Sequence, residues 1–429
     1  MPSPALVQVN LERRKAAHAI YYSFDKLIGG KPITHYPLPI THYQMMIKLS
    51  EFTIEGYKSF AQSTKIELAP LTIIFGKNDS GKSSLCRVPL FLTHIFREKA
   101  ITPFPLELSG IDFGRTLKEI CYGERFQGFT GCLRLENAPF KVIELGGTEL
   151  REKEHRQLVT RFHVISSENS KTVEIENEEN FENVKQLINE ELKPLKMLPD
   201  CIKFVGGMRL RPQRMYRFPS GIRPDVEPDG SHAPHWLFLS EQRNQKLLRA
   251  VSRWFQEYVG LEIFIEQKAG GFEIQAKYPW QHIINMADTG EGIGQVLPIV
   301  TTLTSLATKE VEATFEKCLL ILEQPELYLH PFAHTGIAEL LIAAMDTKHR
   351  LLVETHSDTL LLRIRRAIAE QRIPHTLVRF YYVERSQDGS SISKAIELND
   401  RGTPSWWPRG IFSEDQEEYQ AIRRALSQR

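Results

Sequence analysis

A glycine-rich segment that ends in lysine and serine has the residue types and spacing of a phosphate-binding loop. Residues 76–83 follow the pattern GxxxxGK[ST]. The glycines let the backbone wrap around phosphate oxygens, and consecutive N–H groups point inward to bind them. The lysine reaches the β- and γ-phosphates of a nucleotide, and the serine hydroxyl is a Mg²⁺ ligand. The predicted nucleotide-binding residues are Gly76, Asn78, Ser80, Gly81, Lys82, Ser83 and Ser84.

Acidic and amide side chains directly follow an apolar run later in the chain. Residues 319–322 are Leu-Leu-Ile-Leu, and they lead into Glu323, Gln324 and, after a proline, Glu326. A phosphate-binding loop needs an acid at the end of a second buried strand to hold the water shell of Mg²⁺. We therefore expect Glu323 to share the metal with Ser83.

Two more segments have the polarity to take part in the same site. The strand-like residues 351–354 are followed by Thr355 and His356, and a histidine just past a strand tip can hydrogen-bond a γ-phosphate or an attacking water. Upstream, residues 288–295 form a turn with glycines at Gly290, Gly292 and Gly294 that opens a predicted helix. A helix N-terminus binds anions, although a loop that only caps the helix has the same pattern.

The segments that position these residues alternate between strand and helix patterns. An apolar run at 71–75 precedes the glycine-rich loop, and a helix pattern follows it to Phe96. The last third alternates helix and strand, which is typical of a sheet covered by helices. Alternating segments between 126 and 175 indicate a meander of strands, residues 174–195 an acidic helix, and residues 235–258 one long amphipathic helix.

The predicted fold class is therefore α/β, with a mixed sheet flanked by helices, an antiparallel β subdomain and an inserted helical lid. The expected organisation is an N-terminal extension at 1–44, a lobe with the phosphate loop at 45–165, an inserted helical and loop region at 166–260, and a second lobe at 261–429. Two interpretations of the extension stay open. It is a loose tail upstream of a natural start at Met45 or Met46, or an ordered arm that contacts a partner.

Composition excludes several classes of protein. The net charge of +1 does not indicate nucleic-acid binding, so any basic surface has to be local. No apolar run approaches the roughly 20 residues that a membrane span needs, and the start of the chain lacks a signal-peptide pattern. The five cysteines are scattered without CxxC spacing, which argues against a zinc site or a disulfide framework and suits the cytoplasm.

Taken together, the motifs resemble those of the ATP-binding-cassette ATPases of the SMC/RecF and OLD (overcoming lysogenisation defect) type. The resemblance rests on the order of FGKNDSGKSSL (75–85), GEGIGQVLP (290–298), LLILEQPELYLHP (319–331) and LLVETHSD (351–358). It covers the chain from about residue 47 to its end and implies a P-loop NTPase fold. The segments FVGGMRLRPQRMYRF (204–218) and WWPRGIFSED (406–415) further resemble stand-alone ATPases of bacterial defence islands, which lack coiled-coil arms and a Toprim nuclease domain.

The resemblance implies a head-to-head dimer with two ATP molecules between the subunits. Each site would combine the phosphate loop, Glu323 and His356 of one chain with the signature turn at 290–295 of the other. If the closed dimer binds ATP but not ADP, ATP shifts the equilibrium from separate subunits to the closed dimer. Such a dimer is a switch.

Several positions depart from the pattern of that family. Gln324 stands where the family has a glutamate as general base, and an amide cannot take a proton from water, so slow hydrolysis is expected, with Glu326 as a substitute base. Glu323 replaces the usual aspartate. Gly294 stands where the signature turn has a serine, which leaves backbone N–H groups and Thr289. Gln127 is the one nearby candidate for a glutamine that lines the site.

Arginines gather in two places. Arg209, Arg211, Arg214, Arg217 and Arg223 lie in one loop, and Arg363, Arg365 and Arg366 lie on one predicted helix. Such clusters grip nucleic-acid phosphates, and DNA is therefore one candidate partner. The alternatives are ion pairs with the acidic segment at 174–191 or a subunit interface.

Three functions fit these observations. The first is a dimeric ATP-dependent switch in anti-phage defence that controls a separate effector, such as a nuclease or toxin. The second is a DNA-associated repair ATPase of the RecF/SMC type. The third is an assembly factor that binds nucleotide without turnover. Gln324 favours the first and third functions, whereas the arginine loop leaves the second open.

Overall fold

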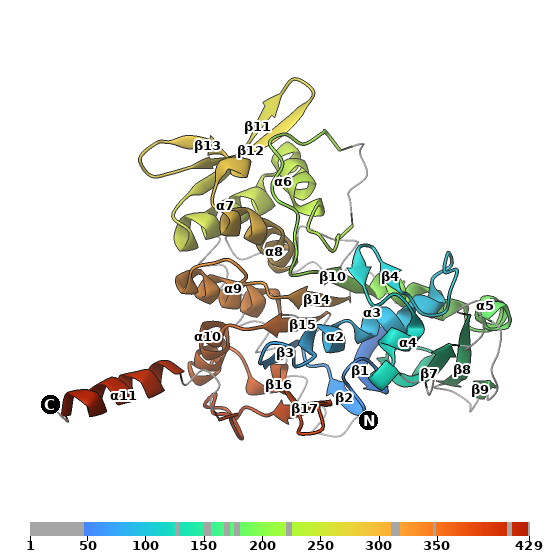
Figure 1. Cartoon of the computed structure of the whole chain (residues 1–429). Helices are drawn as coiled ribbons and strands as arrows, with labels where there is room; N and C mark the ends of the chain where they lie inside the picture. The colour runs from blue at the N-terminus through green and yellow to red at the C-terminus, as the bar shows by residue number, and fades with distance from the viewer. Residues whose placement is uncertain are drawn as a thin grey trace, which may run out of the picture.

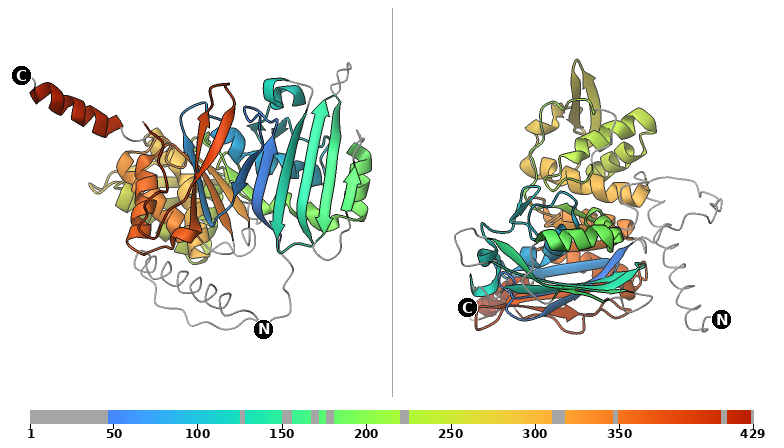
Figure 2. Two further views of the ribbon diagram at one scale, coloured as in Figure 1. Left: turned by 90° about the horizontal axis from the view of Figure 1, so that it is seen from below. Right: turned by 90° about the vertical axis from the view of Figure 1, so that its right-hand side faces the viewer.

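Two six-stranded sheets form the frame of the molecule (Figures 1 and 2). The structure, a computed structural model, describes residues 47–124, 128–149, 156–166, 172–175, 181–219, 225–309, 318–345, 349–409 and 414–427. The N-terminal extension predicted at 1–44, Gln127 and Arg223 lie outside the described residues. No helix in the described part of the chain is both long and apolar enough to cross a bilayer.

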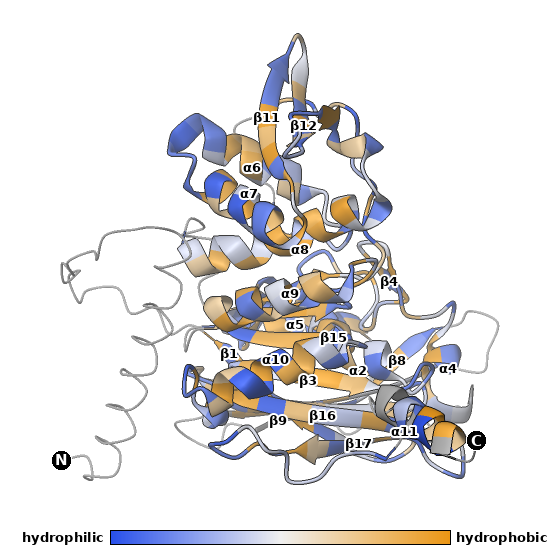
Figure 3. Cartoon of the chain, turned by 90° about the vertical axis from the view of Figure 1, so that its left-hand side faces the viewer, coloured by the Kyte–Doolittle hydropathy of each residue, from blue (hydrophilic) through white to orange (hydrophobic). Residues whose placement is uncertain are grey.

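The central sheet has the order β10-β14-β15-β3-β16-β17, and all strands except β17 run parallel. Its strands are β10 (Ile202–Val205), β14 (Leu319–Glu323), β15 (Arg350–Thr355), β3 (Leu71–Gly76), β16 (Val378–Arg385) and β17 (Ser391–Ile396). Successive residues of a strand point to opposite faces, and both faces are covered here. Ile73 packs into one hydrophobic core and Ile74 into the other. The apolar ribbon of β3 is visible between the helices in Figure 3.

Helices cover one face of this sheet, and the second sheet packs on the other side. The covering helices are α8 (Glu291–Thr308), α9 (Pro331–Ala344) and α10 (Asp358–Ala369). Between the two sheets lie the short helices α2 (Lys82–Cys86), α3 (Val88–Thr93) and η1 (His94–Phe96), where the sequence predicts one helix. The second sheet consists of β2 (Thr64–Glu67), β1 (Lys48–Glu55), β6 (Phe129–Glu136), β7 (Phe140–Glu149), β8 (Gln157–Ser166) and β9 (Thr172–Ile175), all antiparallel.

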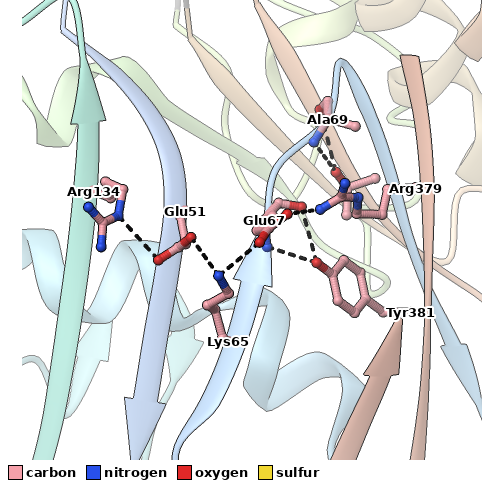
Figure 4. A network of polar contacts seen from close by, with 8 residues as sticks. Glu51, Lys65, Glu67, Ala69, Arg134, Arg379 and Tyr381 are labelled. Carbon is pink, nitrogen blue, oxygen red and sulfur yellow. Dashed lines mark hydrogen bonds and ion pairs between the residues drawn. The ribbon is translucent and has the colours of Figure 1, made fainter. Parts of the chain in front are cut away.

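A polar network joins β16 of the central sheet to β2 and β1 of the second sheet (Figure 4). The hydroxyl of Tyr381 on β16 accepts a hydrogen bond from the backbone N–H of Glu67 at 2.8 Å, and Arg379 pairs with the Glu67 carboxylate. On the other side, Lys65 pairs with Glu67 at 2.8 Å and with Glu51 at 3.1 Å. The sheet that contains the phosphate loop is thereby tied to the antiparallel sheet.

A third group of elements lies above the central sheet, at the top of Figure 1. It contains α6 (His232–Arg243), α7 (Lys246–Tyr258) and a small sheet of β11 (Glu262–Lys268), β12 (Gly271–Lys277) and β13 (Ile283–Asn285). The single helix predicted at 235–258 is wrong, because Gln245 has a φ of 59° and breaks it. The Ser240 hydroxyl accepts from the N–H groups of Leu247 and Leu248 and so caps the start of α7.

Two further segments differ from the sequence interpretation. The acidic segment at 174–195 begins in strand β9, and its helix α5 spans only Phe181–Glu190. Strand β10 lies within the range 166–260 that was interpreted as an inserted region, yet it pairs with β14 in the central sheet. Four strands of that sheet, β3, β14, β15 and β16, have recognisable apolar runs, whereas β10 has only four residues, directly follows a 3-10 helix and gives no periodic signal.

Candidate functional site

The phosphate loop connects β3 to α2, as predicted. Gly81 has a φ of 95°, and a Cβ there would lie 2.6 Å from the Ser59 hydroxyl, so the tight turn requires glycine. The Lys82 ammonium donates to the carbonyl of Lys77 at 2.6 Å and thus folds back over the loop. Burial lowers the pKa of Lys82. Ser80 is buried, and its hydroxyl has no hydrogen-bond partner in the part of the chain that the structure describes.

Ser83 contacts Glu354, a carboxylate that the sequence did not predict as part of the site. The Ser83 hydroxyl donates to Oε1 of Glu354 at 2.9 Å. Glu354 lies at the carboxyl end of β15 with 1% of its surface exposed. Burial, and next the charge of Glu323, raise its pKa to about 7. The sequence pattern around His356 does not by itself distinguish Glu354 from an ordinary strand residue, because its contact with Ser83 joins distant parts of the chain.

Glu323, the acid predicted to hold the metal, is paired with an arginine. Glu323, at the end of β14, forms a bidentate ion pair with Arg87, in which Nε and Nη2 of the guanidinium lie 2.6 and 2.8 Å from the two carboxylate oxygens. Although burial opposes it, the hydrogen bonds and charge of Glu323 raise the pKa of Arg87. Glu323 and Glu354 are register partners on adjacent parallel strands, so both acids face α2.

The loop after β14 brings the predicted catalytic residues together. The backbone of Gln324 has a φ of 42°, and its N–H donates to the carbonyl of Glu354 at 2.8 Å. Oε1 of Glu326 accepts from the Thr355 hydroxyl and from the N–H of His356, both at 2.7 Å. Glu326 thereby fixes the backbone at His356. Burial and the charge of Lys82 lower the pKa of His356 to about 4, so its ring is neutral near pH 7 and can donate through only one nitrogen.

The glycines of the predicted signature turn differ in their surroundings. Gly290 caps the start of α8, and a Cβ on it would meet nothing within 4 Å. A Cβ on Gly292 would lie 2.2 Å from the carbonyl oxygen of Tyr328, and one on Gly294 would lie 2.4 Å from Pro212. Gly292 and Gly294 therefore allow close packing within the chain, while Gly290 faces open space. The Thr289 hydroxyl donates to the carbonyl of Met286 at 2.7 Å.

One arginine of the loop is a buried structural residue. Arg209 is 6% exposed and donates to the carbonyls of Gly206, Gln295, Glu323 and Gln324 at 2.6–3.1 Å. Burial lowers its pKa to about 10. The prediction that Arg209 contacts DNA is wrong, because its guanidinium is buried and donates its hydrogen bonds to carbonyls within the chain. It links the signature helix α8 to the loop after β14.

The exposed arginines near it are paired with acids of the signature turn. Arg211 pairs with Glu291 at 3.0 Å and Arg214 pairs with Asp288 at 2.6 Å. These partners are not in the acidic segment at 174–191. Arg217 is exposed. In the second cluster, Arg363 pairs with Glu339 and Arg366 with Glu370, and Arg365 donates to the carbonyl of Gly402.

The comparison with protein families decides the class of this molecule. The family described as "AAA ATPase domain" matches residues 46–200 and 158–361. The chain belongs to this family. Similar solved structures are an SMC head bound to the C-winged helix domain of ScpA (14% identity, 82% of this chain, 98% of that chain, TM-score 0.44) and the SMC head domain from Thermotoga maritima (12%, 82%, 100%, TM-score 0.37).

A third similar structure is the Smc head domain with an extended coiled coil bound to the C-terminal domain of ScpA, derived from Pyrococcus furiosus (12% identity, 88% of this chain, 100% of that chain, TM-score 0.45). No curated protein sequence matches the chain. The predicted α/β fold and the recognition of the chain as an ATPase are confirmed.

The polar atoms around Ser83 fit the Mg²⁺ that accompanies nucleotide in AAA ATPases. A hydroxyl and two carboxylates supply the hard oxygen donors that this ion prefers. Oε2 of Glu354 is buried without a hydrogen-bond partner among the described residues. No group of three or more His, Cys, Asp or Glu in those residues forms a preassembled metal centre. Ser83, with Glu354 or Glu323, would therefore hold Mg²⁺ together with nucleotide phosphates, and the ion would neutralise phosphate charge there.

Proposed function

We propose that this ATPase is a slowly hydrolysing, ATP-held dimer that serves as a conformational switch for a separate effector, a nuclease or toxin, in anti-phage defence. Two subunits close head to head on two molecules of ATP with Mg²⁺, in the cytoplasm. The phosphate loop of one subunit faces the signature turn of the other. Gly76, Asn78, Ser80, Gly81, Lys82, Ser83 and Ser84 bind the nucleotide.

The position of Gln324 is the observation that supports slow turnover most directly. It follows β14 at the edge of the sheet where Ser83 and His356 also lie, which is where a general base is needed. Its amide cannot accept a proton from water near pH 7. Glu326 is 6% exposed, and its Oε1 is occupied by the Thr355 hydroxyl and the His356 backbone. Binding of ATP is therefore favoured over its rapid hydrolysis.

The open N-terminus of α8 supports a shared site. α8 is 18 residues long, and Gly290 at its start has free space around it. Backbone N–H groups at such a terminus attract anions. A γ-phosphate presented by a second subunit would satisfy them. The defence role rests on the resemblance of residues 204–218 and 406–415 to stand-alone defence ATPases.

Light scattering in the presence of nucleotide tests the dimer. We expect the protein with ATP and Mg²⁺ to have twice the mass that it has with ADP, because only ATP supplies a γ-phosphate to the facing signature turn. Lys82→Ala removes the cation that binds the β- and γ-phosphates and should stay monomeric. If the mass measured with ATP and Mg²⁺ remains that of one chain, the proposed switch is refuted.

Phosphate release with and without duplex DNA separates the switch from a DNA-associated repair ATPase. We expect slow release that DNA leaves unchanged. A DNA-stimulated rate that Lys82→Ala abolishes would favour the repair ATPase and contradict the defence switch.

A further inference from the structure

Two glutamates lie close enough to the phosphate loop to be the carboxylate that binds Mg²⁺. They end adjacent parallel strands in register, Glu323 on β14 and Glu354 on β15, and both face the helix that contains Ser83. Serine in this motif binds Mg²⁺ directly, and one acid completes the metal's surroundings. The contacts of the two carboxylates show which acid is available for that role.

Both oxygens of Glu323 are already occupied. Arg87 donates to Oε1 at 2.6 Å and to Oε2 at 2.8 Å, in the two-pronged geometry that makes such pairs strong. The side chains are largely buried, with 6% of Glu323 and 27% of Arg87 exposed. A cation that recruited Glu323 would have to separate this pair and leave the guanidinium uncompensated.

Glu354 has the opposite arrangement. Its Oε1 accepts from the Ser83 hydroxyl at 2.9 Å, and its Oε2 is buried with no hydrogen-bond partner in the described residues. A buried carboxylate oxygen without a donor is costly, and a bound cation removes that cost. The free oxygen is therefore next to the metal-binding hydroxyl.

We propose that Glu354, rather than Glu323, is the carboxylate that holds Mg²⁺ together with Ser83. Glu323 instead anchors Arg87 and so fixes the short helix α2 against the end of β14. The inference rests on the proposed binding of ATP with Mg²⁺, and it names the acid on this chain that serves the metal. Glu326 also has a buried Oε2 without a hydrogen-bond partner in the described residues, but it is a weaker candidate because its Oε1 contacts Thr355 and His356 and not Ser83.

Metal affinity measured separately from nucleotide affinity tests the assignment. The probe is Mn²⁺, followed by electron paramagnetic resonance at saturating concentrations of a non-hydrolysable ATP analogue. We expect Glu354→Gln to weaken Mn²⁺ binding by about 10–100-fold. Glu323→Gln, which keeps an oxygen for Arg87, should bind Mn²⁺ within about threefold of the unmodified protein. Equal losses in both variants, or a loss only in Glu323→Gln or Glu326→Gln, would overturn the assignment.

Binding of the analogue in EDTA separates failure of this inference from failure of the proposed function. Without metal, Glu354→Gln should bind the analogue at least as well as the unmodified protein, because it removes a negative charge near the phosphates. If the unmodified protein does not bind the analogue, the proposed function fails. If Glu354→Gln does not fold, Glu354→Asp keeps the charge but shortens the side chain and should still weaken Mn²⁺ binding by about tenfold. Unchanged Mn²⁺ affinity in Glu354→Asp would then contradict the assignment.

Discussion

Three buried glutamates at the ends of β14 and β15 have three different partners. Glu323 pairs with Arg87, Glu354 accepts from Ser83, and Glu326 accepts from the backbone of His356. The chemistry that each acid can do depends on which of its oxygens is still without a partner. Both oxygens of Glu323 accept from Arg87, whereas Oε2 of Glu354 and Oε2 of Glu326 are buried without a hydrogen-bond partner among the described residues. Gln324 lies within this group and has no ionisable side chain.

Replacing Gln324 by glutamate should raise ATP turnover. The backbone contacts that hold residue 324, the N–H to Glu354 and the carbonyl to Arg209, do not involve its side chain, so the fold is expected to persist. A positioned general base contributes about 10²–10⁴-fold to rate, and we expect at least about tenfold faster phosphate release at saturating ATP and Mg²⁺. Gln324→Ala, which gains no base, is the control and should stay at the original rate. If both variants are equally slow, residue 324 is not at the base position.

The sequence was sufficient for the phosphate loop but not for the choice among the acids. The spacing of Gly76, Gly81, Lys82 and Ser83 fixes a local backbone shape, so a motif predicts it. The pairing of Glu323 with Arg87 joins residues far apart in the chain, and no local pattern shows it. The segment LLVETHSD contains Glu354, but the sequence gives this acid no role, because its contact with Ser83 exists only after β15 is placed beside β3.

At the scale of elements, the start of α8 is fixed by contacts with two loops. Gly292 approaches the carbonyl of Tyr328 in the loop after β14, and Gly294 approaches Pro212 in the arginine loop. Arg209 joins the same parts, because it donates to the carbonyls of Gln295 and Gln324. The signature turn is therefore coupled to the end of β14 within each chain.

Alanine at Gly292 should destabilise the nucleotide-free protein. Its Cβ would lie 2.2 Å from the Tyr328 carbonyl oxygen, which is backbone and cannot rotate away. Overpacking of this kind costs about 1–3 kcal/mol, and urea unfolding should show a loss of that size. The matched control is Gly290→Ser at the N-cap, where a Cβ meets nothing within 4 Å and serine is a favoured residue, so its stability should be unchanged or slightly higher. A Gly292→Ala variant as stable as Gly290→Ser would show that α8 is free to shift.

The sequence predicted helices and strands correctly where a long segment has a clear apolar run or a regular spacing of apolar residues. The apolar run of β3 and the helix patterns of α8, α9 and α10 were predicted, whereas β11, β12 and β13 were missed. Of those three strands, β11 and β13 are partly exposed and β12 is mostly buried, and none of them has a continuous apolar run like that of β3. The break before α7 depends on the conformation of Gln245, a residue type that does not by itself mark a turn.

At the scale of the whole molecule, charge is distributed so that basic and acidic groups neutralise each other locally. Arg211 and Arg214 point outward near the signature turn, yet each has an acid beside it, Glu291 and Asp288. The helix α11 (Glu414–Ser427) projects away from the body (Figures 1 and 2), with Tyr419 among its exposed side chains. In the described part of the arginine loop, Arg211 and Arg214 are therefore not unpaired positive charges.

Removing the two acids beside Arg211 and Arg214 should give this surface a net positive charge and strengthen its binding to DNA. We expect Asp288→Asn combined with Glu291→Gln to strengthen binding to a short duplex at low salt. Because two freed arginines would displace two counterions, the slope of log K against log salt should steepen by about 2. The control is Glu266→Gln combined with Glu384→Gln, which removes the same charge beside Lys268 and Lys394, outside both arginine clusters, and should leave the slope unchanged. The unmodified protein could instead bind the duplex tightly, with a salt slope that Arg211→Gln combined with Arg214→Gln lowers by about 2. That result would show that the two ion pairs separate when DNA binds, and it would favour the repair ATPase over the switch.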